Sequence, residues 1–262
     1  MTEPQLRFDD GAGYERYMGN WSQRVGTIFL DWLVASKNLK WIDVGCGNGA
    51  FTKLVVDRCT PTEVHGVDPS EDQLAFARTR LAGSLAKFRR GDAMAIPFPA
   101  DAFDVAVMAL VIFFVPNPYK GVAEMTRVVR PGGMIAAYAW DMFGGGFPLE
   151  PIRIEMREMG ITPVNPPSVD ACRIAVMREL WTAAGLEAVE TQEISVKRTF
   201  ADFEDFWTTS MLGTSIRPVI AAMSLADVEL LKARVRTRLP GDAAGRITYA
   251  SRANAVKARV PG

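Results

Sequence analysis

Apolar runs with the length of strands alternate with amphipathic stretches along the first half of this 262-residue chain. Residues 40–44 and 64–67 are short apolar runs, and 105–111 is a longer run that we interpret as a strand buried on both faces. A short strand is expected near 87–89, and another at 134–140 after the helix breaker Pro131-Gly132-Gly133. The alternation of strands with helical stretches predicts an α/β fold.

Helical spacing fills the intervals between these runs. Residues 12–34 carry large apolar side chains at every third or fourth position, which predicts one or two helices before the first strand. Another helix is expected from Ala50 to about residue 58. Ser70-Glu71-Asp72-Gln73 has the pattern of a capping box, so a further helix should begin there.

The pattern changes after Asp141. A proline-rich stretch from 148 to 167 is followed by a predicted helix at 169–184, and residues 186–198 partly alternate, as in a strand. Residues 201–240 are helical again, and 246–260 returns as a last strand, so the helical segment is an insertion within a hairpin. The expected parts are a core with N-terminal helices at 1–141, a substrate-side region at 142–200, a helical lid at 201–240 and the final strand at 241–262.

The most informative local motif lies at the end of the first strand. Trp41-Ile42-Asp43-Val44-Gly45-Cys46-Gly47-Asn48-Gly49 ends in three glycines spaced two apart, and Asp68 follows 19 residues later, at the end of the second strand. Glycines let a backbone approach a ligand closely, and an acid at this point can accept both hydroxyls of a ribose. The spacing Gly-x-Gly-x-Gly differs from the Gly-x-Gly-x-x-Gly of dinucleotide folds.

Five segments in order resemble the class I S-adenosylmethionine-dependent methyltransferases, within them the small-molecule group related to ubiquinone and menaquinone C-methyltransferases (methyltransferase type 11 domain). The segments are WIDVGCGNG, VHGVDPS, GDAMAIPF, FDVAVMALVIFFV and VVRPGG. The resemblance implies S-adenosyl-L-methionine as cofactor. It also implies a Rossmann-like, seven-stranded, mostly parallel sheet with an antiparallel last strand, helices on both faces, and a helical lid between strands six and seven.

The resemblance further implies roles around the glycine turn. Asp68 would accept from the ribose hydroxyls, or else cap the next helix, and Asp43 would hold the turn or the cofactor's amino group, or be purely structural. Asp92 would accept from the adenine amino group, unless it only forms a turn. The Ala93 N–H would donate to the ring, and the Ala109 carbonyl would accept from the methionine ammonium. The expected cofactor-binding residues are Tyr17, Asp43, Gly45, Gly47, Gly49, Asp68, Asp92, Ala93 and Ala109.

The N-terminal helix offers candidates to cover the methionine end of the cofactor. Arg16 would suit its carboxylate, and Tyr14 or Tyr17 would place an aromatic face near the sulfonium. The open alternative is ordinary packing with a solvated arginine.

Substrate contacts are expected beyond the strand ends and in the lid. Phe113 stands just past the fourth strand, where many relatives have histidine, so this position cannot act as a general base. Trp140 and Asp141 follow the fifth strand, and Phe206 and Trp207 lie in the lid, where they could equally form its core. These residues favour a small, apolar or aromatic acceptor. Methyl transfer mainly needs in-line positioning, so no catalytic residue is assigned.

Composition narrows the remaining choices. Lys plus Arg and Asp plus Glu both number 30, which gives no basic excess to indicate a nucleic-acid partner. The three cysteines form no Cys-x-x-Cys pair, so neither a metal site nor a disulfide framework is expected. The polar N-terminus lacks signal-peptide features, and the longest apolar run is too short to cross a bilayer. We therefore expect a cytoplasmic monomer or homodimer without a membrane partner.

The leading hypothesis is thus a methyltransferase acting on a small molecule. A nicotinamide-dependent reductase is disfavoured, because no tyrosine has a lysine four residues later and the glycine spacing disagrees. A protein that binds the cofactor as a sensor or scaffold without turnover is the alternative that stays open, because Phe113 removes an expected base.

Overall fold

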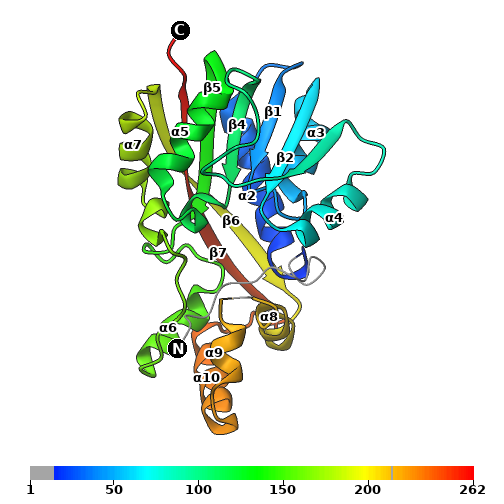
Figure 1. Ribbon diagram of the computed structural model, residues 1–262. Helices are drawn as coiled ribbons and strands as arrows, with labels where there is room; N and C mark the ends of the chain where they lie inside the picture. Colours follow the sequence, from blue (N-terminus) through cyan, green and yellow to red (C-terminus); the bar gives the residue numbers. More distant parts are fainter. Residues whose placement is uncertain (1–14, 214) are drawn as a thin grey trace.

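The computed structural model describes residues 15–213 and 215–262. Its centre is a seven-stranded sheet in the order β3-β2-β1-β4-β5-β7-β6 (Figure 1). The strands are β1 (Lys40–Val44), β2 (Glu63–Asp68), β3 (Ala86–Arg90), β4 (Phe103–Ala109), β5 (Val129–Trp140), β6 (Glu187–Phe200) and β7 (Ile247–Arg259). β7 runs antiparallel to β5 and β6, while the pairs from β3 to β5 are parallel. The predicted fold class is confirmed.

Helices cover both faces of the sheet (Figure 1). On one face, α2 (Asn20–Leu33) and α3 (Ala50–Cys59) pack over β1, β4 and β5 through residues such as Phe29, Val55 and Tyr138. On the other face, α5 (Pro118–Val128) and α7 (Ile174–Ala183) bury Met125 and Trp181 against the same strands. The remaining elements beside the sheet are the π-helical turn η1 (Glu15–Gly19), α4 (Glu71–Arg80) and the short 3₁₀ turns η2 (Ile112–Phe114) and η3 (Val169–Cys172).

Polar side chains cap the starts of several helices, and the cap at Ser70 is the predicted one. Ser70 caps α4 by accepting from the Gln73 N–H, and Ser224 caps α10 (Leu225–Arg238) by accepting from the Asp227 N–H. Such caps satisfy N–H groups that have no partner within the helix.

Three elements differ from the predictions. β5 begins at Val129 instead of 134, so Pro131-Gly132-Gly133 lies within the strand. The helix expected at 169–184 is divided, because Arg173 takes an extended conformation between η3 and α7. β4 ends at Ala109, and Leu110 has a left-handed φ of 63° that bends the chain into η2. This bend at Leu110 sets the direction of the side chains in η2, so it determines which of them face the carboxyl ends of the strands.

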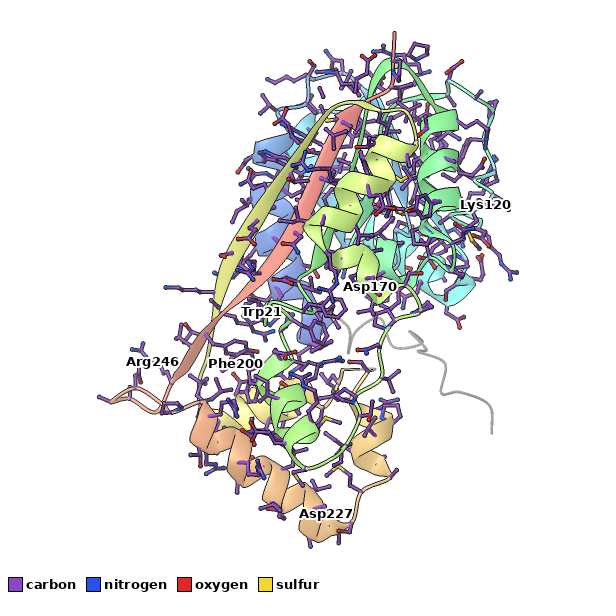
Figure 2. The ribbon with its side chains drawn as sticks, turned by 90° about the vertical axis from the view of Figure 1, so that its left-hand side faces the viewer. Trp21, Lys120, Asp170, Phe200, Asp227 and Arg246 are labelled. Carbon is purple, nitrogen blue, oxygen red and sulfur yellow. The ribbon has the colours of Figure 1, made fainter. Side chains whose placement is uncertain are left out.

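The long hairpin of β6 and β7 carries α8 (Phe203–Ser210), α9 (Arg217–Ala221) and α10. Together with α6 (Glu150–Glu158) these helices form what we call the helical lobe, below the sheet in Figure 1. Figure 2 shows Phe200 where the hairpin enters the lobe. Glu155 of α6 accepts from Arg234 and Arg238 of α10 at 2.7 and 2.6 Å, which joins the two helices.

Within the described residues, no helix is both long and apolar enough to cross a lipid bilayer.

Candidate cofactor site

A cavity of about 560 Å³ opens at the carboxyl ends of β1, β2 and β4. Ligands of open α/β sheets bind beyond these strand ends, and the volume falls within the usual range for small-molecule sites. Seven of the residues expected to bind cofactor line it: Asp43, Gly45, Gly47, Asp68, Asp92, Ala93 and Ala109.

The glycine turn forms one wall of the cavity and needs glycine for two different reasons. Gly45 has a φ of 78°, and a Cβ there would lie 2.5 Å from the side chain of Val111. Gly47 has a φ of 50°, and its missing Cβ would point into open space, with the nearest atom, Gln73 Oε1, 3.8 Å away. The backbone of this turn therefore lies bare toward the cavity, as a close ligand contact requires.

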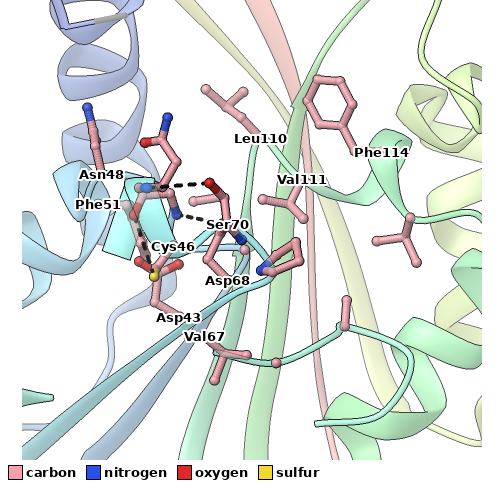
Figure 3. A pocket seen from close by; sticks show the side chains of 18 of the residues that line it. Asp43, Cys46, Asn48, Phe51, Val67, Asp68, Ser70, Leu110, Val111 and Phe114 are labelled. Atoms are coloured by element: carbon pink, nitrogen blue, oxygen red, sulfur yellow. Dashed lines mark hydrogen bonds between the residues drawn. The ribbon is translucent and has the colours of Figure 1, made fainter. Parts of the chain in front are cut away.

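Asp68 fixes this turn to the end of β2 (Figure 3). Its Oδ2 accepts from the Gly47 N–H and its Oδ1 from the Ser70 N–H, both at 2.9 Å. Burial raises the pKa of the Asp68 carboxyl, and the two backbone hydrogen bonds oppose that rise. Ser70, not Asp68, is the residue that caps α4. Each carboxylate oxygen has a second lone pair, so the group can still accept from a ligand hydroxyl.

Asp43 lies deeper, with only 2% of its surface exposed. Its Oδ2 accepts from the Thr52 hydroxyl of α3 at 2.6 Å, while its Oδ1 has no hydrogen-bond partner among the described residues. Burial raises the pKa of Asp43 to about 7, the Thr52 hydrogen bond works against the rise, and the charge of Asp68 adds to it. A buried carboxylate with a vacant oxygen is suited to a ligand that brings a cationic donor.

Asp92 and Ala93 lie where β3 ends, and Asp92 Oδ1 accepts from the Met94 N–H at 2.7 Å. This hydrogen bond forms the turn that was stated as the alternative role of Asp92. Asp92 and Ala93 also line the cavity. Ala109 ends β4 beside Tyr138, whose carbonyl accepts from the Leu110 N–H at 2.8 Å.

Two expected cofactor residues lie elsewhere. Gly49 begins α3 with a φ of 76°, and its missing Cβ would lie 3.0 Å from Ala77 of α4, so this glycine permits helix packing. Tyr17 is buried against Gly213 of the helical lobe, and its carbonyl accepts from Arg198 at 2.8 Å. Tyr14 lies outside the described residues, and Arg16 is exposed.

None of the five expected substrate residues lines the cavity. The buried side chain of Phe113 packs into the core under α5 and α7, because the bend at Leu110 turns it away. Its neighbour Phe114 faces the cavity instead (Figure 3). Phe114, and not the predicted Phe113, is therefore the phenylalanine that lines the cavity after β4.

The other four candidates have structural contacts that explain their positions. Trp140 is buried edge-on against Trp21, with ring centroids 6.4 Å apart. Asp141 accepts from the Gly144 N–H at 2.8 Å and pairs with Arg252 of β7. Phe206 and Trp207 belong to the core of the helical lobe, which was the alternative stated for them.

Several cavity residues gave no signal in the sequence. Ser22 and Phe51 come from α2 and α3, Tyr138 from β5, and Leu110 and Val111 from the bend after β4. Their side chains are ordinary for helices and strands, so only the packing of the elements reveals that they meet.

Residues 42–137 match the model of a methyltransferase domain. The sheet around them has the Rossmann-like fold of known methyltransferases. We call residues 42–137 the methyltransferase core. The methyltransferase core spans the glycine turn, Asp68 and β4, and thus most of the cavity.

Curated relatives match about two fifths of the chain. A 2-methyl-6-phytyl-1,4-hydroquinone methyltransferase of Oryza sativa subsp. japonica is 40% identical over 38% of this chain and 28% of its own length. A demethylmenaquinone methyltransferase of Desulfitobacterium hafniense is 35% identical over 39% of this chain and 43% of its own. The chain thus matches less than half the length of either relative.

The fold extends further than the sequence similarity. A phosphoethanolamine N-methyltransferase 2 of Haemonchus contortus, solved with S-adenosyl-L-methionine, superposes with a TM-score of 0.60 at 18% identity, over 97% of this chain and 58% of that one. The S-adenosyl-L-methionine of that structure is a nucleoside with an amino-acid end. The bare backbone at Gly47 and the vacant oxygen of Asp43 fit such a nucleoside with an amino-acid end.

Proposed function

We propose that this protein transfers a methyl group from S-adenosylmethionine to a small, apolar or aromatic acceptor. The observation that carries the proposal is the cavity itself, which is lined by the glycine turn and Asp68 and by an apolar wall of Val111, Phe114 and Val115. Figure 3 shows Asp68, Val111 and Phe114 around it. The polar side suits the nucleoside and the apolar side suits the acceptor. The names of the two curated relatives support an acceptor of the quinol type.

Bound S-adenosylmethionine supplies an electrophilic methyl group, so the chain's own residues need only bind, orient and exclude water. Asp68 would accept from the ribose hydroxyls while it keeps the turn in place. Asp92 and Ala93 would contact the adenine, and the Ala109 carbonyl would accept from the ammonium group. The apolar wall would hold the acceptor in line and keep water out.

The helical lobe would close the acceptor side as a lid. Tyr17 supports this view, because it ties the segment before α2 to Gly213 of the lobe. We also propose the division into a core, a substrate-side region, a lid and a final strand. A cytoplasmic location and a monomeric or homodimeric state are part of the same proposal.

The second candidate is a protein that binds the cofactor without turnover. One observation favours it: Leu110, Val111, Phe114, Val115 and Pro116, which line the cavity after β4, include no group that could take a proton. A reduced quinol ionises more readily than an alcohol, so its methylation would not need a base from this wall.

Transfer of a labelled methyl group from S-adenosylmethionine to a panel of reduced quinols and simple phenols tests the proposal. We expect product with at least one of them. We also expect Phe114→Leu to raise the KM for an aromatic acceptor several-fold, since an aromatic contact contributes about 0.5–1.5 kcal/mol. Phe143→Leu is the matched control, because Phe143 is exposed and does not line the cavity. Cofactor binding with no transfer to any acceptor or metabolite extract would favour the non-catalytic alternative.

A further inference from the structure

Ser22 lies in the first turn of α2 and lines the cavity from the side of the helices. Its hydroxyl oxygen is buried, and it has no hydrogen-bond partner among the described residues. Buried polar groups are nearly always paired, because burial removes their hydrogen bonds to water. An unpaired hydroxyl beside a cavity can therefore gain its missing partner from a molecule that fills the cavity.

Other helical hydroxyl groups in this protein show what Ser22 would do without a ligand. A hydroxyl within a helix commonly donates to the carbonyl four residues earlier. The threonines that do so here are Thr79, Thr126, Thr208 and Thr237. Ser22 makes no such hydrogen bond, and the carbonyl four residues earlier is that of Met18 in the π-helical turn η1.

A second unpaired polar atom, Asp43 Oδ1, lies on the same side of the sheet. Asp43 accepts from Thr52 of α3, and α3 packs against α2. Gly26, one helical turn after Ser22, lies against Phe51 and Tyr138, which both line the cavity. The residues that line the cavity thus include one hydroxyl and one carboxylate whose buried oxygens have no partner among the described residues.

The amino-acid end of S-adenosylmethionine is a zwitterion, whose ammonium group needs acceptors and whose carboxylate needs donors. While it is ionised, Asp43 has no proton to donate, so it can accept from the ammonium group but cannot donate to the carboxylate. No Lys, Arg or His is among the described residues that line the cavity, so within this lining only neutral donors can meet the carboxylate. We propose that the Ser22 hydroxyl donates to the carboxylate of the cofactor's amino-acid end while Asp43 accepts from its ammonium group. The inference rests on the proposed function, since it assumes that the cavity takes this cofactor.

Two ligands that differ only at this end of the molecule test the assignment by calorimetry. S-adenosylhomocysteine has the amino-acid end, and 5′-methylthioadenosine lacks it. We expect Ser22→Ala to weaken S-adenosylhomocysteine binding roughly tenfold or more, since the lost hydrogen bond is to a charged group. Binding of 5′-methylthioadenosine should change less than about twofold, because that ligand makes no contact with Ser22.

Thr27→Ala is the matched control, because it removes a hydroxyl from the same helix outside the cavity. It should leave both affinities unchanged. The melting temperature of unliganded Ser22→Ala should equal or exceed that of the wild type, because the variant loses a buried group without a partner. Should that variant fail to fold, Ser22→Cys replaces the hydroxyl with a weak donor of similar size and gives the same comparison.

An unchanged affinity of Ser22→Ala for S-adenosylhomocysteine would overturn the inference and leave the proposed function intact. An equal loss for both ligands would also overturn it, because Ser22 would then act on the nucleoside or on the shape of the cavity. If the wild-type protein bound neither ligand, the proposed function would fail as well.

Discussion

The methyltransferase core and the helical lobe position their residues by opposite means. In the core, backbone groups do most of the positioning: Gly45 N–H donates to the Val67 carbonyl at 2.7 Å, and Asp68 accepts from the Gly47 N–H. In the lobe, side chains do it, through the hydrogen bonds of Glu155 to α10 and the aromatic contacts of Phe206. Positioning by backbone groups requires particular residues such as glycine, whereas a side chain in a packed contact can be replaced by another side chain of similar shape. This difference agrees with the match to the methyltransferase domain model, which covers residues 42–137 and none of the helices of the lobe.

If the two regions are separate in function, changes in the lobe should alter stability and turnover, and changes in the core should alter cofactor binding. The largest effect is expected for Phe206→Ala. Phe206 is fully buried, and its ring lies 5.4 Å from Phe200 and 5.8 Å from Tyr249. Urea unfolding should show a loss of about 3–5 kcal/mol.

Phe206→Leu is the control for this change and should cost less than about 1.5 kcal/mol. The folded fraction of Phe206→Ala should bind S-adenosylhomocysteine as the wild type does. A large loss of cofactor affinity would show that the lobe and the core do not act separately.

Asp68→Ala should have the next largest effect, on the core. Wild-type protein with S-adenosylhomocysteine at 100 times its Kd gains about 2.7 kcal/mol of stability, and the variant should gain almost none. Thermal unfolding with and without ligand measures the difference. Asp68→Asn retains one acceptor oxygen and should give an intermediate gain. A wild-type gain in Asp68→Ala would remove Asp68 from the site.

Glu155→Gln should weaken the joint between α6 and α10. The Glu155 side chain is 5% exposed, and the two arginines that it binds are about one-third exposed, so we expect a loss of roughly 1–2 kcal/mol. Hydrogen exchange should quicken in α10, and turnover should fall while cofactor affinity holds. Glu158→Gln is the matched control, since its half-exposed carboxylate binds the same arginines and should contribute less than about 0.5 kcal/mol. Equal effects of the two variants would show that burial of Glu155 does not matter.

The smallest effect concerns pH. Burial raises the pKa of Asp43 from 3.8 to about 7. Between these values the folded protein keeps a proton that the unfolded chain has lost, so stability without ligand should fall as the pH rises. Cofactor affinity should change in the opposite direction, because only the ionised carboxylate accepts well from an ammonium group.

Between pH 6 and 7.5, S-adenosylhomocysteine affinity should therefore rise about five- to tenfold. Calorimetry at the two pH values measures the rise, and Asp43→Asn should remove it. A similar rise in that variant would assign the pH dependence to another group.

The sequence predicted the seven-stranded sheet with its antiparallel last strand, and the turn at Gly45 and Gly47. Hydrophobic periodicity identifies strands, and glycine at these two positions follows from backbone geometry alone. The position of Asp68 at the end of β2 was predicted for a related reason, since the residue ends an apolar run at a set number of residues after the glycine turn.

Prediction failed where a side chain's direction depends on tertiary structure. Phe113 and Phe114 are adjacent and chemically identical, and only the left-handed conformation of Leu110 decides which one faces the cavity. Gly49 looks like a third cofactor glycine in the sequence, although its lack of a side chain is needed by Ala77 of α4. Asp141 was expected near substrate, and its partner Arg252 lies 111 residues away in the sequence.

The β6–β7 hairpin has a consequence for how such a protein can diversify. Phe200 and Ile247 are paired neighbours in the ladder, so the chain leaves the sheet and re-enters it at adjacent points. A short turn would close the same gap, and so would a cassette of different helices. Replacement of the helices between β6 and β7 could therefore change the acceptor preference, while the residues proposed to bind the methyl donor stay the same.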